Sequence, residues 1–298
     1  MTDETMNLPS GMRWLASQVA GHHSDLTKNR ISMIETDNGC VLKAGQREDL
    51  QLREVSFYEN IKNSNESLYN ELSMLTPKYY GTRELELGER RIEFIILEDM
   101  TVGMTEPCVM DVKIGERTWD PLATREKRAA EEMKYVDSKK AYGFCIPGFQ
   151  VYDLSTRNLR KFGKDYGKTL NKDTIVDAFR IFLNAEDDSN KCGILLEKLI
   201  NRLNKIKDFS RKQKTLRFYS SSILITYDAN YLRRRAEELS CSPENKSSLT
   251  EECAEEMDWV RVRMIDFTHI FPAEEETLDT NYLRGITNLV QVLESFLK

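Results

Sequence analysis

Hydrophobic positions along the chain follow two patterns, short β-branched runs and longer segments in which apolar residues return every three or four positions. The short runs predict strands, and they lie at 31–35, 40–43, 91–97, 107–114, 144–146, 149–152, 217–227 and 260–265. The longer segments predict helices, and they lie at 47–62, 66–75, 124–140, 173–184, 193–209 and 280–298. The pattern therefore predicts a chain that mixes both kinds of element throughout.

Turn residues and polar segments mark where these elements end. Asn38-Gly39 lies between two β-type runs, which is a strong signal for a hairpin, and 86–89 predicts a second hairpin turn. The polar stretch 153–167 predicts a connection between elements. Residues 1–10 lack periodicity and predict a mobile terminus. The acidic, serine-rich stretch 236–258 predicts a disordered surface loop.

The stretch 107–115 combines an apolar strand with two opposite charges. Asp111 and Lys113 are two residues apart, so their side chains point to the same face of the strand. Charges on an apolar strand need a reason because each is costly to desolvate. A ligand with hydroxyls and phosphates supplies one, since a carboxylate binds hydroxyls and a lysine binds phosphate as a point charge. A salt-bridged sheet edge is the alternative.

These residues carry a resemblance to a known family. Pro107, Asp111, Lys113 and Gly115 match the P-x-x-x-D-x-K-x-G signature of the inositol polyphosphate kinases, and the chain looks like the multikinase branch. Three further motifs follow in the family's order, and the resemblance covers roughly residues 14–298: Gln18-Val19-Ala20-Gly21-His22, Ser221-Ser222-Ile223-Leu224 and Ile265-Asp266-Phe267. Ile223 departs from the leucine of the family's S-S-L-L motif, a swap of equal volume.

The resemblance implies an α+β, two-lobed kinase-like fold with an antiparallel sheet in each lobe and an ATP cleft between the lobes. The N-terminal lobe would comprise residues 1–100 and the C-terminal lobe 101–298. The implied reaction is ATP- and Mg²⁺-dependent phosphorylation of hydroxyls on inositol tris- and tetrakisphosphates toward the pentakisphosphate. Catalysis would come from positioning and charge neutralisation.

The resemblance also assigns the nucleotide contacts. Lys43 would hold the ATP phosphates and Asp266 the Mg²⁺, while Asp111 would bind the ribose hydroxyls. Adenine would be recognised by the backbone, through the C=O of Glu98 and the N–H of Met100. By analogy with protein kinases, the helix residue Glu54 pairs with Lys43. Asp111 is the one nearby candidate for a general base.

The inositol phosphate is expected at the other end of the cleft. Lys113 would contact the substrate and the transferring phosphoryl group. Lys127 and Lys134 are seven residues apart on the expected helix 124–140, so they would share a face toward the substrate. A solvated helix face is the alternative, and Ala130 and Glu131 stand where animal multikinases have glutamines. Further substrate contacts are expected from Gln46 and His269.

Composition limits the other possibilities. The chain has 298 residues, 40% of them hydrophobic and 31% charged, which suffices for one two-lobed domain or two small ones. No apolar run is long enough to predict a membrane anchor, and no leader is recognisable. The net charge of −6 argues against nucleic acid as a partner. Six cysteines without a C-x-x-C pair predict the reduced thiols of an intracellular protein. We also expect a monomer, located in the nucleus and/or cytoplasm.

Three alternatives to the multikinase reading stay open. The stretches 217–222 and 126–130 also resemble inositol hexakisphosphate kinases, which make pyrophosphates. A phosphoinositide lipid kinase side activity is compatible with the resemblance, although no basic amphipathic helix supports membrane docking. A non-catalytic scaffold is disfavoured because Lys43, Asp111, Lys113 and Asp266 are all present.

Overall fold

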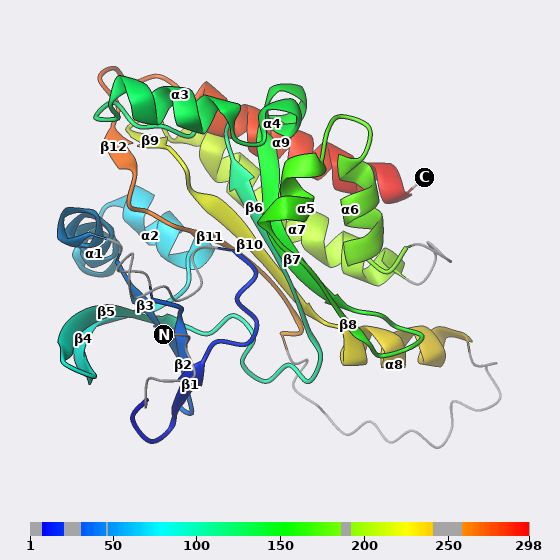
Figure 1. Cartoon of the computed structure of the whole chain (residues 1–298). Coiled ribbons are helices and arrows are strands. Elements are labelled where there is room, and N and C mark those ends of the chain that lie inside the picture. Colours follow the sequence, from blue (N-terminus) through cyan, green and yellow to red (C-terminus); the bar gives the residue numbers. More distant parts are fainter. Residues whose placement is uncertain (1–7, 21–30, 46, 186–191, 241–257, 298) are drawn as a thin grey trace.

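The structure is a computed structural model that describes residues 8–20, 31–45, 47–185, 192–240 and 258–297. Two five-stranded antiparallel sheets form its framework (Figure 1), and a two-stranded sheet lies beside them. The first large sheet ends at Glu98 and the second begins at Pro107. The boundary between lobes at residue 100 stays a prediction.

The first sheet has the strand order β1-β2-β3-β5-β4. Its strands are β1 Met12–Trp14, β2 Ile34–Thr36, β3 Cys40–Ala44, β4 Tyr79–Leu87 and β5 Arg90–Glu98. The Asn-Gly signal is confirmed, since β2 pairs with β3 antiparallel and Gly39 adopts a φ of +78° in the turn. Helix α1, Glu48–Asn63, packs against β4 and against α2, Ser67–Leu75.

The second sheet has the order β11-β10-β6-β7-β8. Its strands are β6 Pro107–Ile114, β7 Phe144–Tyr152, β8 Leu159–Phe162, β10 Ser222–Asp228 and β11 Val260–Ile265. The motif strand β6 is the middle strand, hydrogen-bonded to β10 on one side and to β7 on the other. The alternative of a salt-bridged sheet edge is therefore wrong.

Helices cover this sheet and carry much of the core (Figure 1). They are α3 Arg125–Met133, α4 Val136–Tyr142, α5 Lys164–Thr169, α6 Ile175–Phe182, α7 Gly193–Lys212, α8 Ala229–Ser240 and α9 Thr280–Glu294, which the 3-10 turn Ser295–Leu297 extends. The expected leucine stripe of α7 is buried, with Leu195, Leu199 and Leu203 each fully covered. Helix α7 packs on α9 and β11, which fixes the back of the sheet.

Two expected elements differ because the backbone leaves regular geometry at one residue. The expected helix 124–140 is two helices, since Tyr135 takes a left-handed φ of 52° between α3 and α4. The expected strand 217–227 is also divided, because Ser220 has a φ of 55°. Its first part, β9 Leu216–Phe218, pairs with β12 Ile270–Pro272 in the small sheet, and β10 joins the large sheet.

Other expectations need smaller corrections. The runs 144–146 and 149–152 form one strand, β7, which bulges opposite β6 instead of breaking at Pro147-Gly148. The connection 153–167 contains β8 and the start of α5. Residues 236–240 belong to α8, so the predicted loop begins later than expected. The rest of that loop, 241–257, and residues 1–7 of the expected terminus lie outside the described residues.

Candidate active site

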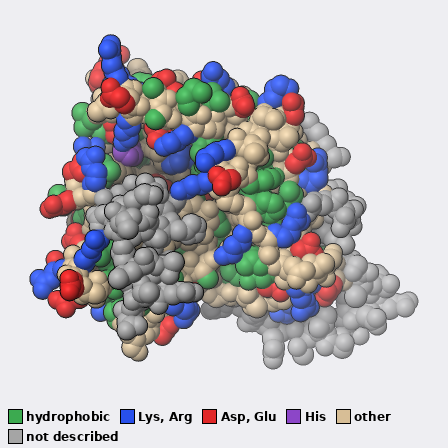
Figure 2. Space-filling view, in the orientation of Figure 1, with side chains coloured by type: hydrophobic (Ala, Val, Ile, Leu, Met, Phe, Trp, Pro, Cys, Tyr) green, Lys and Arg blue, Asp and Glu red, His purple; other side chains and the backbone are tan. Residues whose placement is uncertain are grey.

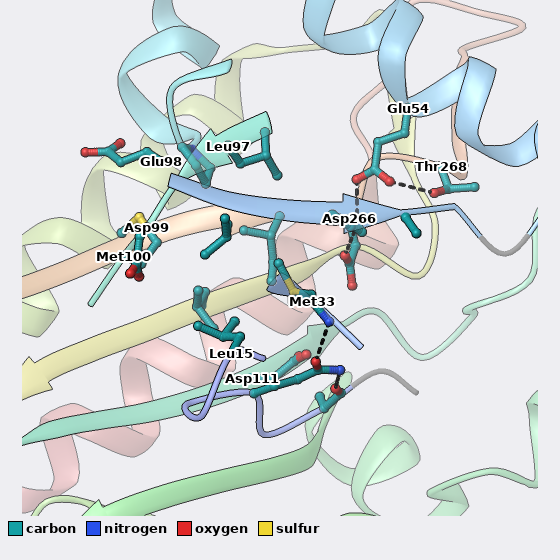
Figure 3. Close-up of a pocket in the computed structure, with 18 of the residues that line it drawn as sticks. Leu15, Met33, Glu54, Leu97, Glu98, Asp99, Met100, Asp111, Asp266 and Thr268 are labelled. Carbon is teal, nitrogen blue, oxygen red and sulfur yellow. Dashed lines mark hydrogen bonds and ion pairs between the residues drawn. The ribbon is translucent and has the colours of Figure 1, made fainter. Parts of the chain in front are cut away.

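A pocket of about 310 Å³ lies between the two large sheets (Figure 3). Its lining comes from strand β3, helix α1, the connection after β5, strand β6 and the residues after β11. The site residues that line it are Lys43, Glu54, Glu98, Met100, Asp111, Asp266 and His269. The residues expected at the ATP site, which are scattered between positions 43 and 266, thus line a single cavity together with His269, which was expected to contact the substrate.

Lys43 is the charged centre of this pocket. Its Nζ lies 2.7 Å from Oε1 of Glu54 and 2.6 Å from Oδ1 of Asp266. The expected Lys43–Glu54 pairing is therefore confirmed. The pocket also joins Lys43 to Asp266, the residue expected to hold the metal. Burial works against the ammonium, but the charges of Asp266 and Glu54 outweigh it and raise the pKa of Lys43.

Glu54 organises the residues that follow β11. Its side chain is 3% exposed. Oε1 accepts the backbone N–H of Phe267 at 3.2 Å, and Oε2 accepts the hydroxyl of Thr268 at 3.2 Å. Because Asp266 has a left-handed φ of 65°, the chain turns sharply there and presents its carboxylate to Lys43. Burial opposes ionisation of Asp266, yet Lys43 prevails and lowers the pKa of this carboxyl.

The connection after β5 forms the expected adenine edge of the pocket. Glu98 and Met100 both line it, and the labelled residues 98–100 lie together at the end of the strand in Figure 3. The backbone N–H of Asp99 donates to the carbonyl of Gly39 at 3.0 Å, which ties the connection to the β2–β3 turn. The Met100 carbonyl accepts the Thr226 hydroxyl at 3.0 Å and so is fixed to β10. The assignment of Glu98 and Met100 to adenine stays a prediction.

Asp111 and Lys113 project from the middle strand of the second sheet. Asp111 is 7% exposed, and its Oδ1 is buried without a hydrogen-bond partner among the described residues. Burial, followed by the charge of Asp266, raises the pKa of Asp111 to about 6, although Lys113 partly offsets this. Lys113 Nζ donates to the carbonyl and hydroxyl oxygens of Ser220, at 2.6 and 3.0 Å.

The expected substrate lysines do not share a helix face. Lys127 lies in the first turn of α3, but α3 ends at Met133, and Lys134 has extended backbone with ψ 126°. The Nζ of Lys134 is 2.6 Å from Oε1 of Glu131, so this ammonium already has a carboxylate partner. The expectation that Lys127 and Lys134 share one face is wrong because the helix stops before Lys134. Their contact with substrate stays a prediction.

His269 and Gln46 complete the expected substrate contacts. His269 lines the pocket, and its Nδ1 lies 2.5 Å from Oδ2 of the buried Asp120. Burial lowers the pKa of His269, and Lys127 and Lys113 act in the same direction, against Asp120. Gln46 lies outside the described residues, as do Gly21 and His22 of the expected N-terminal motif.

Three residues of the site were not predicted as site residues. Asp120 holds His269, Ser220 holds Lys113, and Thr268 binds Glu54. Ser220 directly precedes the Ser-Ser-Ile-Leu motif and Asp120 lies in the Asp-Pro turn, so both stand next to signals that the sequence displays. Their roles depend on the turn at Ser220 and on the return of the chain after β11, neither of which the local sequence predicts.

Comparisons with known proteins agree with this geometry. The family model "Inositol polyphosphate kinase" matches residues 94–294. The chain is 31% identical to the inositol polyphosphate multikinase of Homo sapiens over 218 residues, which are 72% of this chain and 51% of that protein. It is 25% identical to the inositol polyphosphate multikinase beta of Arabidopsis thaliana over 296 residues, 94% of this chain and 92% of that one. The chain spans about half the length of the mammalian relatives it matches.

A second branch of relatives is also similar. Inositol hexakisphosphate kinase 2 of Homo sapiens is 30% identical over 270 residues, 82% of this chain and 62% of that protein. Identity to the two branches is therefore nearly equal, and overall identity does not separate them.

Solved structures share the fold. The inositol phosphate multikinase Ipk2 of S. cerevisiae, determined in complex with ADP and Mn²⁺, superposes with a TM-score of 0.66 over 87% of this chain and 99% of that one, at 20% identity. A second multikinase structure superposes with a TM-score of 0.61 over 81% of this chain and 98% of that one, at 23% identity. The predicted α+β, two-lobed kinase-like fold is confirmed. With the family match covering the motif strand and the carboxylate after β11, the chain belongs to the inositol polyphosphate kinase family.

Proposed function

We propose that this protein is an ATP-dependent kinase that phosphorylates hydroxyls of soluble inositol polyphosphates, taking tris- and tetrakisphosphates toward the pentakisphosphate. The observation that carries the proposal is the position of Lys43, which contacts both Glu54 and Asp266 inside a pocket of about 310 Å³. The family membership and the multikinase relatives support the choice of substrate.

The carboxylates of the pocket suit a nucleotide-bound Mg²⁺. Magnesium usually takes only one or two carboxylates from the protein and completes its octahedral shell with waters and substrate phosphates. Asp266 provides one carboxylate, and within the described ranges no group of three or more His, Cys, Asp or Glu forms a dedicated metal cage. Mg²⁺ held at Asp266 would neutralise charge on the transferring phosphoryl group.

The protein's own side chains divide the remaining work. Lys43 holds the nucleotide phosphates. To do so, its ammonium gives up the contact with Asp266 that it makes in this structure. Asp111 accepts hydrogen bonds from hydroxyls, because its buried Oδ1 has no partner among the described residues. With a pKa raised to about 6, this carboxylate is also suited to accept a proton near neutral pH. Lys113, held by Ser220, places its ammonium on the same face of β6 and stabilises the phosphoryl group in transit.

The substrate end is basic on a protein that is acidic overall. Figure 2 shows Lys and Arg side chains gathered on the face that also exposes a histidine. His269 lines the pocket, and in addition to burial the charges of Lys113 and Lys127 both lower the pKa of its imidazole, so these two ammonium groups act on this side of the pocket. Because the protein has a net charge of −6, it can attract a polyphosphate only through positive charge that is concentrated locally.

The experiment is incubation with ATP, Mg²⁺ and a panel of inositol phosphates, followed by chromatography of the products. We expect tris- and tetrakisphosphates to gain phosphates, and the Asp266→Asn protein to convert none of them. The proposal is overturned if the wild-type protein, with a normal melting curve, leaves every inositol phosphate unchanged.

A second candidate is inositol hexakisphosphate kinase activity. The human hexakisphosphate kinase 2 is nearly as similar to this chain as the human multikinase, and it covers more of it. The same panel separates the two, because a pyrophosphate product has a distinct phosphorus NMR signal. Vesicles that contain phosphoinositides test the lipid side activity in parallel.

The proposal includes an intracellular monomer, in the nucleus and/or cytoplasm. The support is the chemistry of the cysteines: Cys40, Cys108, Cys145 and Cys192 are free thiols, and the last three are buried. Among the described helices, none combines the length and apolar character needed to cross a bilayer. Sedimentation analysis of the purified protein tests the monomeric state.

A further inference from the structure

A stack of arginine and aromatic side chains lies beside the substrate end of the pocket. The guanidinium carbon of Arg117 is 3.7 Å from the centroid of the Trp119 ring, and that of Arg128 is 4.5 Å from the same ring. Arg117 also lies 4.7 Å from the ring centroid of Tyr219. The aromatic faces attract the cations and hold both guanidinium planes in defined positions.

Backbone carbonyls, and not carboxylates, fix these two arginines. Arg117 Nε donates to the carbonyl of Trp119 at 3.1 Å. Arg128 donates through Nε to Ala123 at 3.0 Å and through a terminal nitrogen to Pro121 at 3.1 Å. Considering only the described residues, neither guanidinium forms an ion pair, and the terminal nitrogens of Arg117 have no hydrogen-bond acceptor. Two positive charges thus lie on one ring, and neither has an ion-pair partner among the described residues.

A neighbouring carboxylate does not neutralise them. Glu132 lies one helical turn beyond Arg128 on α3. Its Oε1 accepts the indole N–H of Trp119 at 3.2 Å, so it supports the ring on which the arginines stack. Glu131 is engaged as well, with Lys134 at 2.6 Å. The guanidinium groups therefore remain available to an external anion.

The stack adjoins the residues already placed at the substrate end. Trp119 directly precedes Asp120, whose carboxylate contacts Nδ1 of His269 at 2.5 Å. Tyr219 directly precedes Ser220, the partner of Lys113, and its own backbone N–H donates to the carbonyl of His269 at 3.2 Å. Both aromatic rings are thus carried by residues next to the pocket.

We infer that Arg117 and Arg128, stacked on Trp119, form an anion subsite that binds a phosphate of the inositol polyphosphate remote from the reacting hydroxyl. This inference rests on the proposed function. A ring with several phosphates needs more positive charge than Lys113 and Lys127 provide, and Lys134 is already paired with Glu131. The guanidinium fork matches two phosphate oxygens at once, which a lysine does not do.

The test is calorimetric titration with inositol hexakisphosphate, without nucleotide, on the wild-type protein and on Arg117→Gln and Arg128→Gln. Each variant loses a charge-assisted hydrogen bond to phosphate, so its Kd should rise roughly tenfold. The difference should shrink as salt is raised, because an exposed charge is screened over about 8 Å at physiological ionic strength. Unchanged Kd values in both variants would overturn the inference.

Arg160→Gln is the matched control, because Arg160 stacks on Phe162 at 5.4 Å on β8, away from α3. This variant should bind the probe as the wild-type protein does, and an equal loss would show that any surface arginine suffices. If Arg117→Gln melts early, Arg117→Lys keeps the charge without the fork. It should fold and still bind several-fold more weakly, whereas full affinity in this variant would contradict the proposed fork.

The failure of the subsite and that of the proposed function give different results. Binding of the hexakisphosphate is measured without turnover, so an arginine-dependent Kd in a protein without kinase activity would support the subsite and overturn the function. If the wild-type protein turns over inositol phosphates but both Gln variants bind the hexakisphosphate unchanged, the proposed function is supported and the subsite is overturned.

Discussion

Lys43 Nζ lies 2.6 Å from Asp266 Oδ1, although the two residues are 223 positions apart in the sequence. Lys43 projects from the first sheet and Asp266 directly follows β11 of the second, so the contact joins the two sheets across the pocket. In our account the lysine serves the nucleotide phosphates and the aspartate serves Mg²⁺. The nucleotide must therefore compete with this ion pair, and the two residues have to be tested separately.

Asp266→Asn removes the charge proposed to hold the metal and keeps the shape of the side chain. We expect turnover to fall by about a thousandfold or more, because a metal contributes several kcal/mol to the stabilisation of the transition state. Steady-state kinetics with a coupled assay measure the change. The circular dichroism spectrum should stay unchanged, and near-normal turnover in the folded variant would remove Asp266 from the metal site.

Glu54→Gln weakens the support of both Lys43 and the chain after Asp266. Because Glu54 is 3% exposed and bonds Lys43, Phe267 and Thr268, its loss should lower the free energy of unfolding by about 2–4 kcal/mol. The KM for ATP should rise as well. Glu48→Gln, exposed on the same helix, is the control for urea denaturation. Equal stability of the two variants would contradict this role of Glu54.

Asp111→Asn should make the protein more stable at neutral pH while reducing activity. The pKa of Asp111 is raised from 3.8 to about 6 on folding, so ionisation opposes folding as the pH rises through this window. Above pH 6 the penalty approaches roughly 3 kcal/mol, and below about pH 4 it vanishes. Urea denaturation at several pH values measures the gain.

Asp153→Asn should change the stability at neutral pH in the opposite direction, which makes it a useful comparison. Backbone N–H groups, that of Thr156 first, lower the pKa of Asp153, so its charge supports the fold above its unfolded pKa. That variant should lose stability at neutral pH and converge with the wild type in acid. A pH-independent gain in Asp111→Asn would show that burial of its charge is not the cause.

Gly148→Ala should displace the segment before residue 21 from β7. A Cβ at Gly148 would lie 2.1 Å from the carbonyl oxygen of Val19, and Val19 lines the nucleotide pocket. We expect a loss of about 1–3 kcal/mol in stability from overpacking and a several-fold rise in KM for ATP. Gly163→Ala is the control, because nothing lies within 4 Å of its added Cβ and its φ of −96° is permitted. If the two variants behave alike, Gly148 has no special role in positioning the segment.

The sequence located the residues that line the pocket between the two large sheets because their signals are local. Asp111 and Lys113 share a strand face at a spacing of two residues, and Lys43 follows a hairpin that Asn38-Gly39 marks. The pair Lys43–Glu54, 11 positions apart, followed from the analogy with protein kinases. Each of these inferences needs only the regular geometry of one or two elements.

The substrate end depends on irregular backbone that the sequence does not display. Tyr135 and Ser220 both adopt left-handed φ, which for residues other than glycine is set by packing. Tyr135 is held where Gly167 leaves room for its ring, and Lys139 donates to the carbonyl of Glu131 at 2.5 Å beside it. The backbone leaves helical geometry at Lys134 and Tyr135, so helical periodicity alone placed that lysine incorrectly.

Phosphoryl transfer to an inositol polyphosphate is the central claim, and one measurement tests it most directly. An inositol tetrakisphosphate is incubated with ATP, Mg²⁺ and the wild-type protein, and phosphorus NMR follows both reactants over time. The account predicts that one pentakisphosphate forms for each ADP released, and that neither appears with Asp266→Asn. Release of ADP without phosphorylation of the ring, or no consumption of either reactant by the folded wild-type protein, would contradict it.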